Sequence, residues 1–304
     1  MRGLGVELMG DVPFVVGSES ADVWSHASQF QLQLSLGAPP DDFSADGQDW
    51  GLPPYDWLAM EVDDLAWVRM RARRAARLYD RFRLDHVVGY FRQWVRRKDG
   101  CDCGRFDPAG TEGQRARGRR VLGAVLDELS RTTERIDEPR AIAEDLGVVP
   151  AFVRESLREF GMPGYRVLPW EKDAHVFRDP GAFPNESVVS WSTHDTAPID
   201  AWWPELPEPD RAQLAQRACV AVGQDDDPDR SIGLLGDMYR AKSDLALVLV
   251  QELLGSKDRI NTPGTVGPQN WTWRLPRPIE DLVDDPHVAS RIDAIRALVG
   301  ASGR

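Results

Sequence analysis

The chain has 304 residues, of which 42% are apolar and 28% are charged, a composition typical of a globular protein with material for one large core. Its formal net charge is −12, and its lysines and arginines are scattered or lie in helical runs, so nucleic acids and anionic membranes are disfavoured as partners. Its apolar runs are shorter than the ~18 residues that span a bilayer, and Glu7 and Asp11 interrupt the N-terminal run, so we expect no export signal and a cytoplasmic protein.

The first predicted strand lies in the apolar run 6–16 and ends near Asp11, where Gly10 and Pro13 interrupt the run. Residues 35–57 follow as a loop rich in glycine and proline, with aromatic rings among acids and amides. Such a surface suits a polyol, although a loop that only packs its own rings is the alternative. Residues 61–81 have the pattern of an amphipathic helix that leads into a strand at Arg83.

The second half of the chain continues the alternation of strands and helices. Residues 96–118 are interpreted as a variable insertion before an amphipathic helix over 121–129. Further strands are predicted near 141–146, 165–168, 188–195 and 245–251, with helices over 150–160, 211–222 and 288–298.

About six strands, near residues 6, 83, 141, 165, 188 and 245, therefore alternate with helices. This rhythm predicts an α/β fold of the (β/α)8 TIM-barrel type, in one domain over 1–304, with its chemistry at the C-terminal ends of the strands. A doubly wound sheet is the alternative, but no glycine-rich phosphate loop follows any of the strands.

Three carboxylates stand at predicted strand ends, namely Asp85, Glu144 and Asp195. Arg83 shares a strand face with Asp85, because side chains alternate with a period of two. An arginine beside an aspartate in an apolar cup would hold it ionised, as a carboxylate nucleophile requires. An ordinary buried Arg–Asp pair is the alternative, and the other two acids favour the catalytic interpretation.

Metal and redox chemistry are not indicated. Cys101 and Cys103 lie in a loop without the second Cys/His pair that zinc needs, and with Cys219 they are expected to be reduced thiols. A metal-dependent barrel hydrolase, with His86, His194, Asp85 and Glu144 as ligands, is a remote alternative. The absence of a His-x-His pair on any strand argues against it. We expect no metal and no cofactor.

The segments around the three acids resemble the catalytic segments of 4-α-glucanotransferases, the amylomaltases of glycoside hydrolase family 77. They are Arg83-Leu-Asp-His86, Ala143-Glu-Asp-Leu-Gly147 and Thr193-His-Asp195. Other segments are similar in the same order: Gly10-Asp-Val-Pro13, Ala38-Pro-Pro-Asp-Asp-Phe-Ser44, Gly47-Gln-Asp-Trp-Gly51, Gly161-Met-Pro-Gly164, Asn261-Thr-Pro-Gly-Thr265 and Asn270-Trp-Thr-Trp273. The resemblance extends from about Gly10 to Trp273.

The resemblance implies retaining transfer of α-1,4-glucan segments between maltooligosaccharides. Asp85 would be the nucleophile, Glu144 the general acid/base and Asp195 the transition-state stabiliser. It also implies that Arg83 and His194 bind the donor sugar. The remaining implied substrate-binding residues are Phe43, Gln48 and Trp50 in the acceptor loop and Asn261 in the Asn-Thr-Pro-Gly segment.

The chain departs from the family in two ways. It has Val88-Gly89 where many members have Arg before Gly, and Thr196 where many have Asn. Family members also carry a long N-terminal region with the first two barrel strands, so we expect an incomplete barrel that needs a missing N-terminal fragment or self-association. A hydrolase of α-1,4-glucans and an inactive fragment that only binds glucan remain alternatives.

Overall fold

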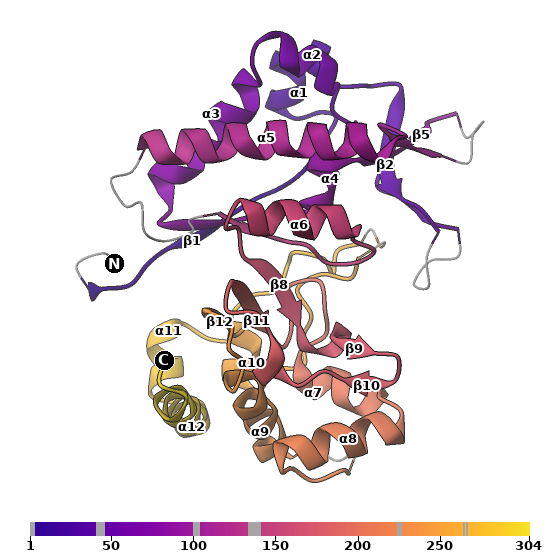
Figure 1. Cartoon of the computed structure of the whole chain (residues 1–304). Helices are drawn as coiled ribbons and strands as arrows, with labels where there is room; N and C mark the ends of the chain where they lie inside the picture. The colour runs from indigo at the N-terminus through magenta and orange to yellow at the C-terminus, as the bar shows by residue number, and fades with distance from the viewer. Residues whose placement is uncertain are drawn as a thin grey trace. The chain divides into compact units, whose positions relative to one another are not determined.

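The computed structural model of the chain describes residues 4–40, 46–99, 104–132, 141–223, 227–263, 265 and 267–304 (Figure 1). The chain divides into two compact units, residues 1–164 and 165–304. Each unit has its own cluster of buried apolar side chains.

Parallel strands form the centre of the first unit. β1 (Met9–Val12) pairs with β4 (Arg81–Leu84), which pairs with β7 (Ala141–Ala143). The register sets Asp11 opposite Arg83. The last residue of this unit, Gly164, begins β8 (Gly164–Val167) and pairs with Ala143 in the parallel sense.

In the second unit the strand order runs from β8 to β11 (Ser187–Ser190) and then to β12 (Leu245–Leu247), and β11 and β12 are parallel. The six strands predicted from apolar runs are therefore all present: β1, β4 and β7 in the first unit, and β8, apart from its first residue, with β11 and β12 in the second.

Helices pack over the strands of the first unit, and their apolar faces explain why they form. α3 (Ala66–Leu78) buries Trp67, Val68 and Ala72, while Arg73, Arg74 and Arg77 are exposed. It packs against α5 (Thr111–Thr132). The remaining helical segments of this unit are α1 (Ala21–Ser25), η2 (Ala27–Gln29), α2 (Trp57–Val62), α4 (Val88–Phe91) and α6 (Ala151–Glu159).

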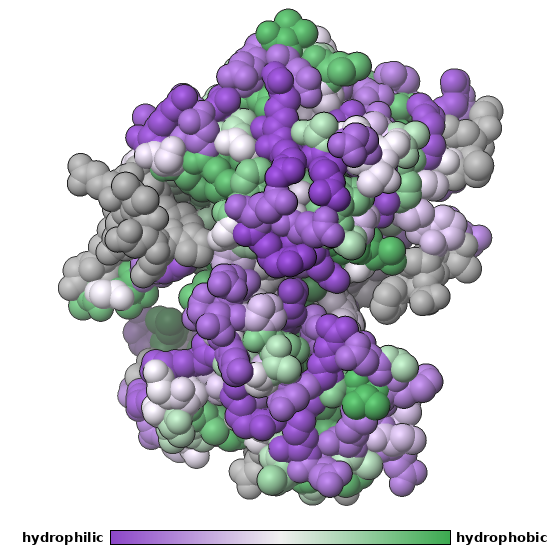
Figure 2. Space-filling view, viewed as in Figure 1, coloured by the Kyte–Doolittle hydropathy of each residue, from purple (hydrophilic) through white to green (hydrophobic). Residues whose placement is uncertain are grey.

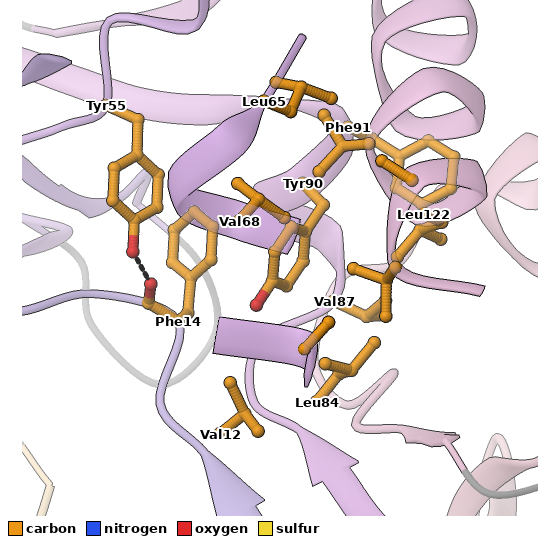
Figure 3. Close-up of a cluster of buried hydrophobic side chains, with 14 of the residues drawn as sticks. Val12, Phe14, Tyr55, Leu65, Val68, Leu84, Val87, Tyr90, Phe91 and Leu122 are labelled. Atoms are coloured by element: carbon orange, nitrogen blue, oxygen red, sulfur yellow. Dashed lines mark hydrogen bonds between the residues drawn. The ribbon is translucent and has the colours of Figure 1, made fainter. Parts of the chain in front are cut away.

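The core of the first unit gathers aromatic rings around the end of β1 (Figure 3). Phe14 lies edge-on to Tyr55 and Tyr90, with ring centroids 5.2 and 5.0 Å apart. The Tyr55 hydroxyl donates a hydrogen bond to the Phe14 carbonyl, as the dashed line in Figure 3 shows. A buried tyrosine thus satisfies its polar end by fixing the chain that leaves β1.

An antiparallel sheet in the first unit was not predicted. Its strand order is β3-β2-β5-β6, and the strands are β2 (Leu34–Ala38), β3 (Gln48–Asp49), β5 (Gln93–Arg97) and β6 (Arg105–Asp107). The expected loop 35–57 therefore contains two strands, and the expected insertion 96–118 contains β6 and the start of α5. Gly37 lets β3 approach, since a Cβ there would lie 1.9 Å from the Gln48 carbonyl oxygen.

The second unit surrounds its strands with helices and a short hairpin. The hairpin joins β9 (Lys172–Asp173) to β10 (Val176–Phe177). The helices are α7 (Ile199–Trp202), α8 (Glu208–Ala218), α9 (Pro228–Tyr239), α10 (Val250–Leu254), α11 (Ile279–Val283) and α12 (Pro286–Ser302). Short 3-10 turns are η3 (Leu168–Trp170), η4 (Pro180–Ala182) and η5 (Trp203–Glu205).

The helix expected over 211–222 begins earlier and ends at Ala218, because Cys219 adopts the left-handed conformation that terminates a helix. The face drawn in Figure 2 mixes hydrophilic and hydrophobic residues in both units. None of the helices in the described ranges combines the length and the apolar character of a membrane span.

Candidate active site

Two of the predicted acids end neighbouring strands of the first unit. Asp85 follows β4 and Glu144 follows β7, and these strands are parallel. The carboxyl ends of parallel strands meet at one edge of a sheet, so both side chains stand at the same edge. Arg83 precedes Asp85 by two residues and shares its face, as the alternation predicts.

The guanidinium of Arg83 lies beside three carboxylates. It donates to Asp11 at 2.7 and 3.0 Å, lies 2.9 Å from a carboxylate oxygen of Asp85, and lies 3.7 Å from Glu144. Burial opposes the charge of Arg83, but Asp85, Asp11 and Glu144 outweigh it and hold the pKa of Arg83 above its usual range. A single buried cation therefore offsets part of the negative charge of three neighbouring acids.

Glu144 has the environment of a carboxyl group that can carry a proton near neutral pH. Burial raises its pKa to about 7, the charge of Asp85 adds to the rise, and Arg83 opposes it. Its two oxygens accept the backbone N–H groups of His86, at 2.8 Å, and Leu146, at 3.0 Å. These bonds fix the carboxyl group in place, while burial sets its protonation.

Asp85 is held by the chain that leaves β1. Its Oδ2 accepts the backbone N–H of Phe14 at 3.1 Å, while Oδ1 faces Arg83. The next residue, His86, has a left-handed backbone with φ of 44°, and its ring lies 5.5 Å from that of Phe14. Burial lowers the pKa of His86, so the neutral ring is favoured at physiological pH.

Two residues of the predicted acceptor loop reach this group. The Trp50 ring lies edge-on to His86, with centroids 5.1 Å apart, and its Nε1 donates to Gln48 at 3.0 Å. Gln48 is fixed in β3 by its pairing with Ala38 of β2. Phe43, the third residue predicted for this loop, lies outside the described residues.

The other predicted residues form a second group within the second unit. Asn261 donates to Asp195 at 2.6 Å, and His194 Nε2 lies 3.1 Å from the other carboxylate oxygen. Arg259 donates to the Asp195 carbonyl at 2.9 Å. The Trp271 ring, which is 61% exposed, lies 5.3 Å from the His194 ring. Arg259 and Asn261 also line an open polar pocket with Thr262, Gln269, Asn270 and Trp273.

The sequence matches the model of glycoside hydrolase family 77, described as 4-alpha-glucanotransferase, over residues 1–280. The chain belongs to this family. The 4-alpha-glucanotransferase of Chlamydia trachomatis is 32% identical over 301 residues, which cover 95% of this chain and 55% of that protein. The chloroplastic/amyloplastic enzyme of Arabidopsis thaliana is 34% identical over 321 residues, which cover 100% of this chain and 51% of that protein. The chain thus spans about half the length of these curated relatives.

Among solved structures, the amylomaltase of Streptococcus agalactiae in complex with acarbose superposes with a TM-score of 0.81 at 26% identity, covering 100% of this chain and 59% of that one. The amylomaltase of Corynebacterium glutamicum shares the fold, with a TM-score of 0.75 at 21% identity over 94% of this chain and 46% of that one. These likenesses confirm the predicted fold class, an incomplete (β/α) barrel, and the predicted glycoside hydrolase 77 membership.

Sequence reasoning overlooked one member of the acid group in this family 77 chain. Asp11 stands at the end of β1, bound to Arg83, and the same strand-end signal that singled out Asp85 was available for it. Arg259 was also overlooked, because an arginine in a turn carries no such signal. Within the described residues, no group of three or more histidine, cysteine, aspartate or glutamate side chains is arranged to hold a metal ion. Cys101 and Cys103 lie outside the described residues.

Proposed function

We propose that the chain contributes the catalytic centre of a 4-α-glucanotransferase, which moves α-1,4-glucan segments between maltooligosaccharides by retaining double displacement. The observation that carries this proposal is the pairing of Asp85 with Glu144 around Arg83. Retaining transfer needs one carboxylate to attack and one carboxyl group to give a proton. The raised pKa of Glu144, about 7, suits the second of these tasks.

In the first step, a carboxylate oxygen of Asp85 attacks the anomeric carbon of the donor glucan. The bond from that carbon to the glycosidic oxygen breaks, and Glu144 transfers its proton to the departing oxygen. The products are a glycosyl–Asp85 ester and a shortened glucan. Arg83 and the Phe14 N–H keep Asp85 oriented for this attack.

In the second step, Glu144 accepts the proton of an incoming 4-hydroxyl group. The hydroxyl oxygen attacks the anomeric carbon, the ester bond to Asp85 breaks, and an α-1,4 bond replaces the one that was lost. Over the two steps one α-1,4 bond is broken and one is made, so the exchange is nearly isoenergetic. Trp50 and Gln48, with Phe43, would hold the acceptor sugar and favour it over water.

The second unit would supply the transition-state stabiliser. Asn261 and His194 contact the Asp195 carboxylate, which is suited to accept hydrogen bonds from sugar hydroxyls. These hydrogen bonds strengthen as the sugar ring approaches an oxocarbenium ion.

We further propose that turnover needs a polypeptide that covers β1. This strand pairs with β4 on one side, and no strand of the described residues pairs with its other side. Parallel strands are normally buried by neighbours on both sides. An N-terminal fragment of the family or a second copy of this chain could supply the missing strand.

The test is product analysis after incubation of the chain with maltotriose, alone and mixed with an N-terminal fragment of the family. With β1 covered, we expect a ladder of longer and shorter maltooligosaccharides that disappears in Asp85→Ala and in Glu144→Gln. Asp293→Ala is the matched control, because this aspartate is 71% exposed on α12. Glucose and maltose alone would indicate a hydrolase, and no products from a folded chain mixed with an N-terminal fragment would contradict the proposal.

A further inference from the structure

A buried glutamate fastens both ends of the loop that carries His194 and Asp195. This loop leaves β11 at Ser190 and enters α7 at Ile199. Oε1 of Glu252, on α10, accepts the Ser192 hydroxyl at 2.5 Å and the Ile199 N–H at 3.1 Å. One carboxylate oxygen therefore joins the beginning of the loop to its end.

Glu252 is itself fixed by contacts with other helices, as a residue that anchors a loop must be. It is 2% exposed, and its backbone carbonyl accepts Arg291 of α12 at 2.7 Å. Arg291 also donates to Ser231 of α9 at 3.0 Å. Three helices therefore hold the position from which the carboxylate reaches the loop.

Burying a carboxylate costs free energy unless hydrogen bonds or ion pairs compensate for the lost water. The groups that contact Glu252 therefore indicate what its carboxylate does. Burial raises the pKa of Glu252 to about 7; the Ser192 and Ile199 bonds lower it, Asp200 raises it and Arg291 lowers it. An amide or an apolar residue would fill the same space without this cost. An apolar residue accepts no hydrogen bond, and a carboxylate oxygen is a stronger acceptor than an amide oxygen for the two donors.

The loop has further bonds that set its internal shape. The Thr193 N–H donates to the Thr196 hydroxyl at 2.8 Å, and the Asn261 N–H donates to the His194 carbonyl at 3.1 Å. These bonds shape the turn around Asp195, whereas those of Glu252 anchor its ends to the helices beneath.

We propose that Glu252 is a positioning residue that sets the place of His194 and Asp195 through Ser192 and Ile199. The proposal rests on the proposed transferase function for its catalytic consequence, but its structural part stands alone. Glu252 touches no reacting group in this scheme. It acts by limiting the movement of the loop, because a small misplacement of a catalytic group lowers the rate strongly.

The test compares amide hydrogen exchange in Glu252→Leu, Glu252→Gln and Ser192→Ala. In Glu252→Leu, we expect exchange within 191–199 to be at least about tenfold faster, the change that corresponds to about 1.4 kcal/mol. Exchange within α8 should stay unchanged. Glu252→Gln should recover part of the protection, because its amide oxygen still accepts a hydrogen bond, and Ser192→Ala should lose protection at the start of the loop.

Glu128→Leu is the matched control, because Glu128 is also 2% exposed but lies on α5 of the first unit. It should leave exchange within 191–199 unchanged. Equal exchange in Glu252→Leu and the wild type, or an equal increase throughout the second unit, would overturn the proposal. If the wild type transfers glucan, kcat should fall at least tenfold with a smaller change in KM. If it does not, the exchange data still decide.

Discussion

At the scale of single residues, the candidate site depends on one guanidinium. Arg83 forms ion pairs with Asp11, Asp85 and Glu144, and its side chain is 11% exposed. Three negative charges around one positive charge leave an excess that favours a proton on one acid. Glu144 is the most distant of the three from Arg83 and is largely buried, and burial raises its pKa to about 7.

Asp11→Asn should lower glucan transfer about 10- to 100-fold. Hydrogen bonds between charged groups contribute about 1.5–3 kcal/mol, and an asparagine would lack the charge that holds Arg83 through two bonds. Initial rates with maltotriose measure the effect. Asp99→Asn removes an exposed partner of Arg97 and should leave the rate unchanged. A full rate in Asp11→Asn would show that Arg83 needs no orientation from β1.

The protonation of Glu144 should make the stability of the protein depend on pH. An unperturbed glutamate has a pKa of 4.5, and burial raises that of folded Glu144 to about 7. Between these values the folded state binds a proton that the unfolded chain has released. The stabilisation is complete below pH 4.5 and is lost as the pH rises through 7, by about 3 kcal/mol.

Glu144→Gln removes this titration, so its free energy of unfolding should fall less than that of the wild type between pH 5 and pH 8. Denaturant titrations at both values measure the difference. Glu155→Gln, at a 45% exposed glutamate on α6, is the control and should follow the wild type. Parallel pH dependence of Glu144→Gln and the wild type would contradict the raised pKa.

At the scale of elements, the segment between β1 and α1 orients Asp85. The Phe14 N–H donates to Asp85, the Tyr55 hydroxyl donates to the Phe14 carbonyl, and Arg71 donates to the Pro13 carbonyl at 2.6 Å. Gly89 on α4 leaves the space for the Phe14 ring, since a Cβ there would lie 2.4 Å from it. The departure at Val88-Gly89 thus keeps the glycine that this packing needs.

Gly89→Ala should lower the free energy of unfolding by about 1–3 kcal/mol, the usual cost of overpacking a core. Moving the Phe14 ring would also disturb its N–H bond to Asp85, so activity should fall with stability. Gly123→Ala on α5 is the matched control: no atom lies within 4 Å of its added Cβ. Alanine in a helix interior should stabilise there by about 0.5–1 kcal/mol. Denaturant titration of both variants provides the comparison, and an unchanged Gly89→Ala would contradict the packing argument.

The parallel strands and their terminal acids were predictable because each is a local signal, a short apolar run followed by a carboxylate. The antiparallel sheet was not, because β2 lies beside a stretch rich in glycine and proline and pairs with β5, far along the chain. Asp11 had the strand-end signal, but its pairing with Arg83, 72 residues away, had none. Glu252 gave no signal either, since its role comes from two donors more than 50 residues earlier.

At the scale of the whole molecule, the candidate acids lie in two units, and each unit orders its own group. Asp85, Glu144 and Arg83 meet in the first unit, and Asp195, His194 and Asn261 meet in the second. Each group is held by side chains of its own unit.

No strand in the described part of the chain pairs with the outer side of β1, so the chain should associate with itself when no other strand is supplied. Residues beside this edge expose apolar side chains: Val6 is 49% exposed and Leu8 is 38% exposed. Such edges add strands from other chains, and an inserted lysine prevents it. Sedimentation velocity should show species larger than the monomer that increase with concentration, and Val6→Lys should shift them toward the monomer. Val62→Lys changes a valine that is 88% exposed on α2, away from any strand, and should leave the distribution unchanged. A wild-type chain that stays monomeric at high concentration, or equal responses in both variants, would show that β1 is not an association edge.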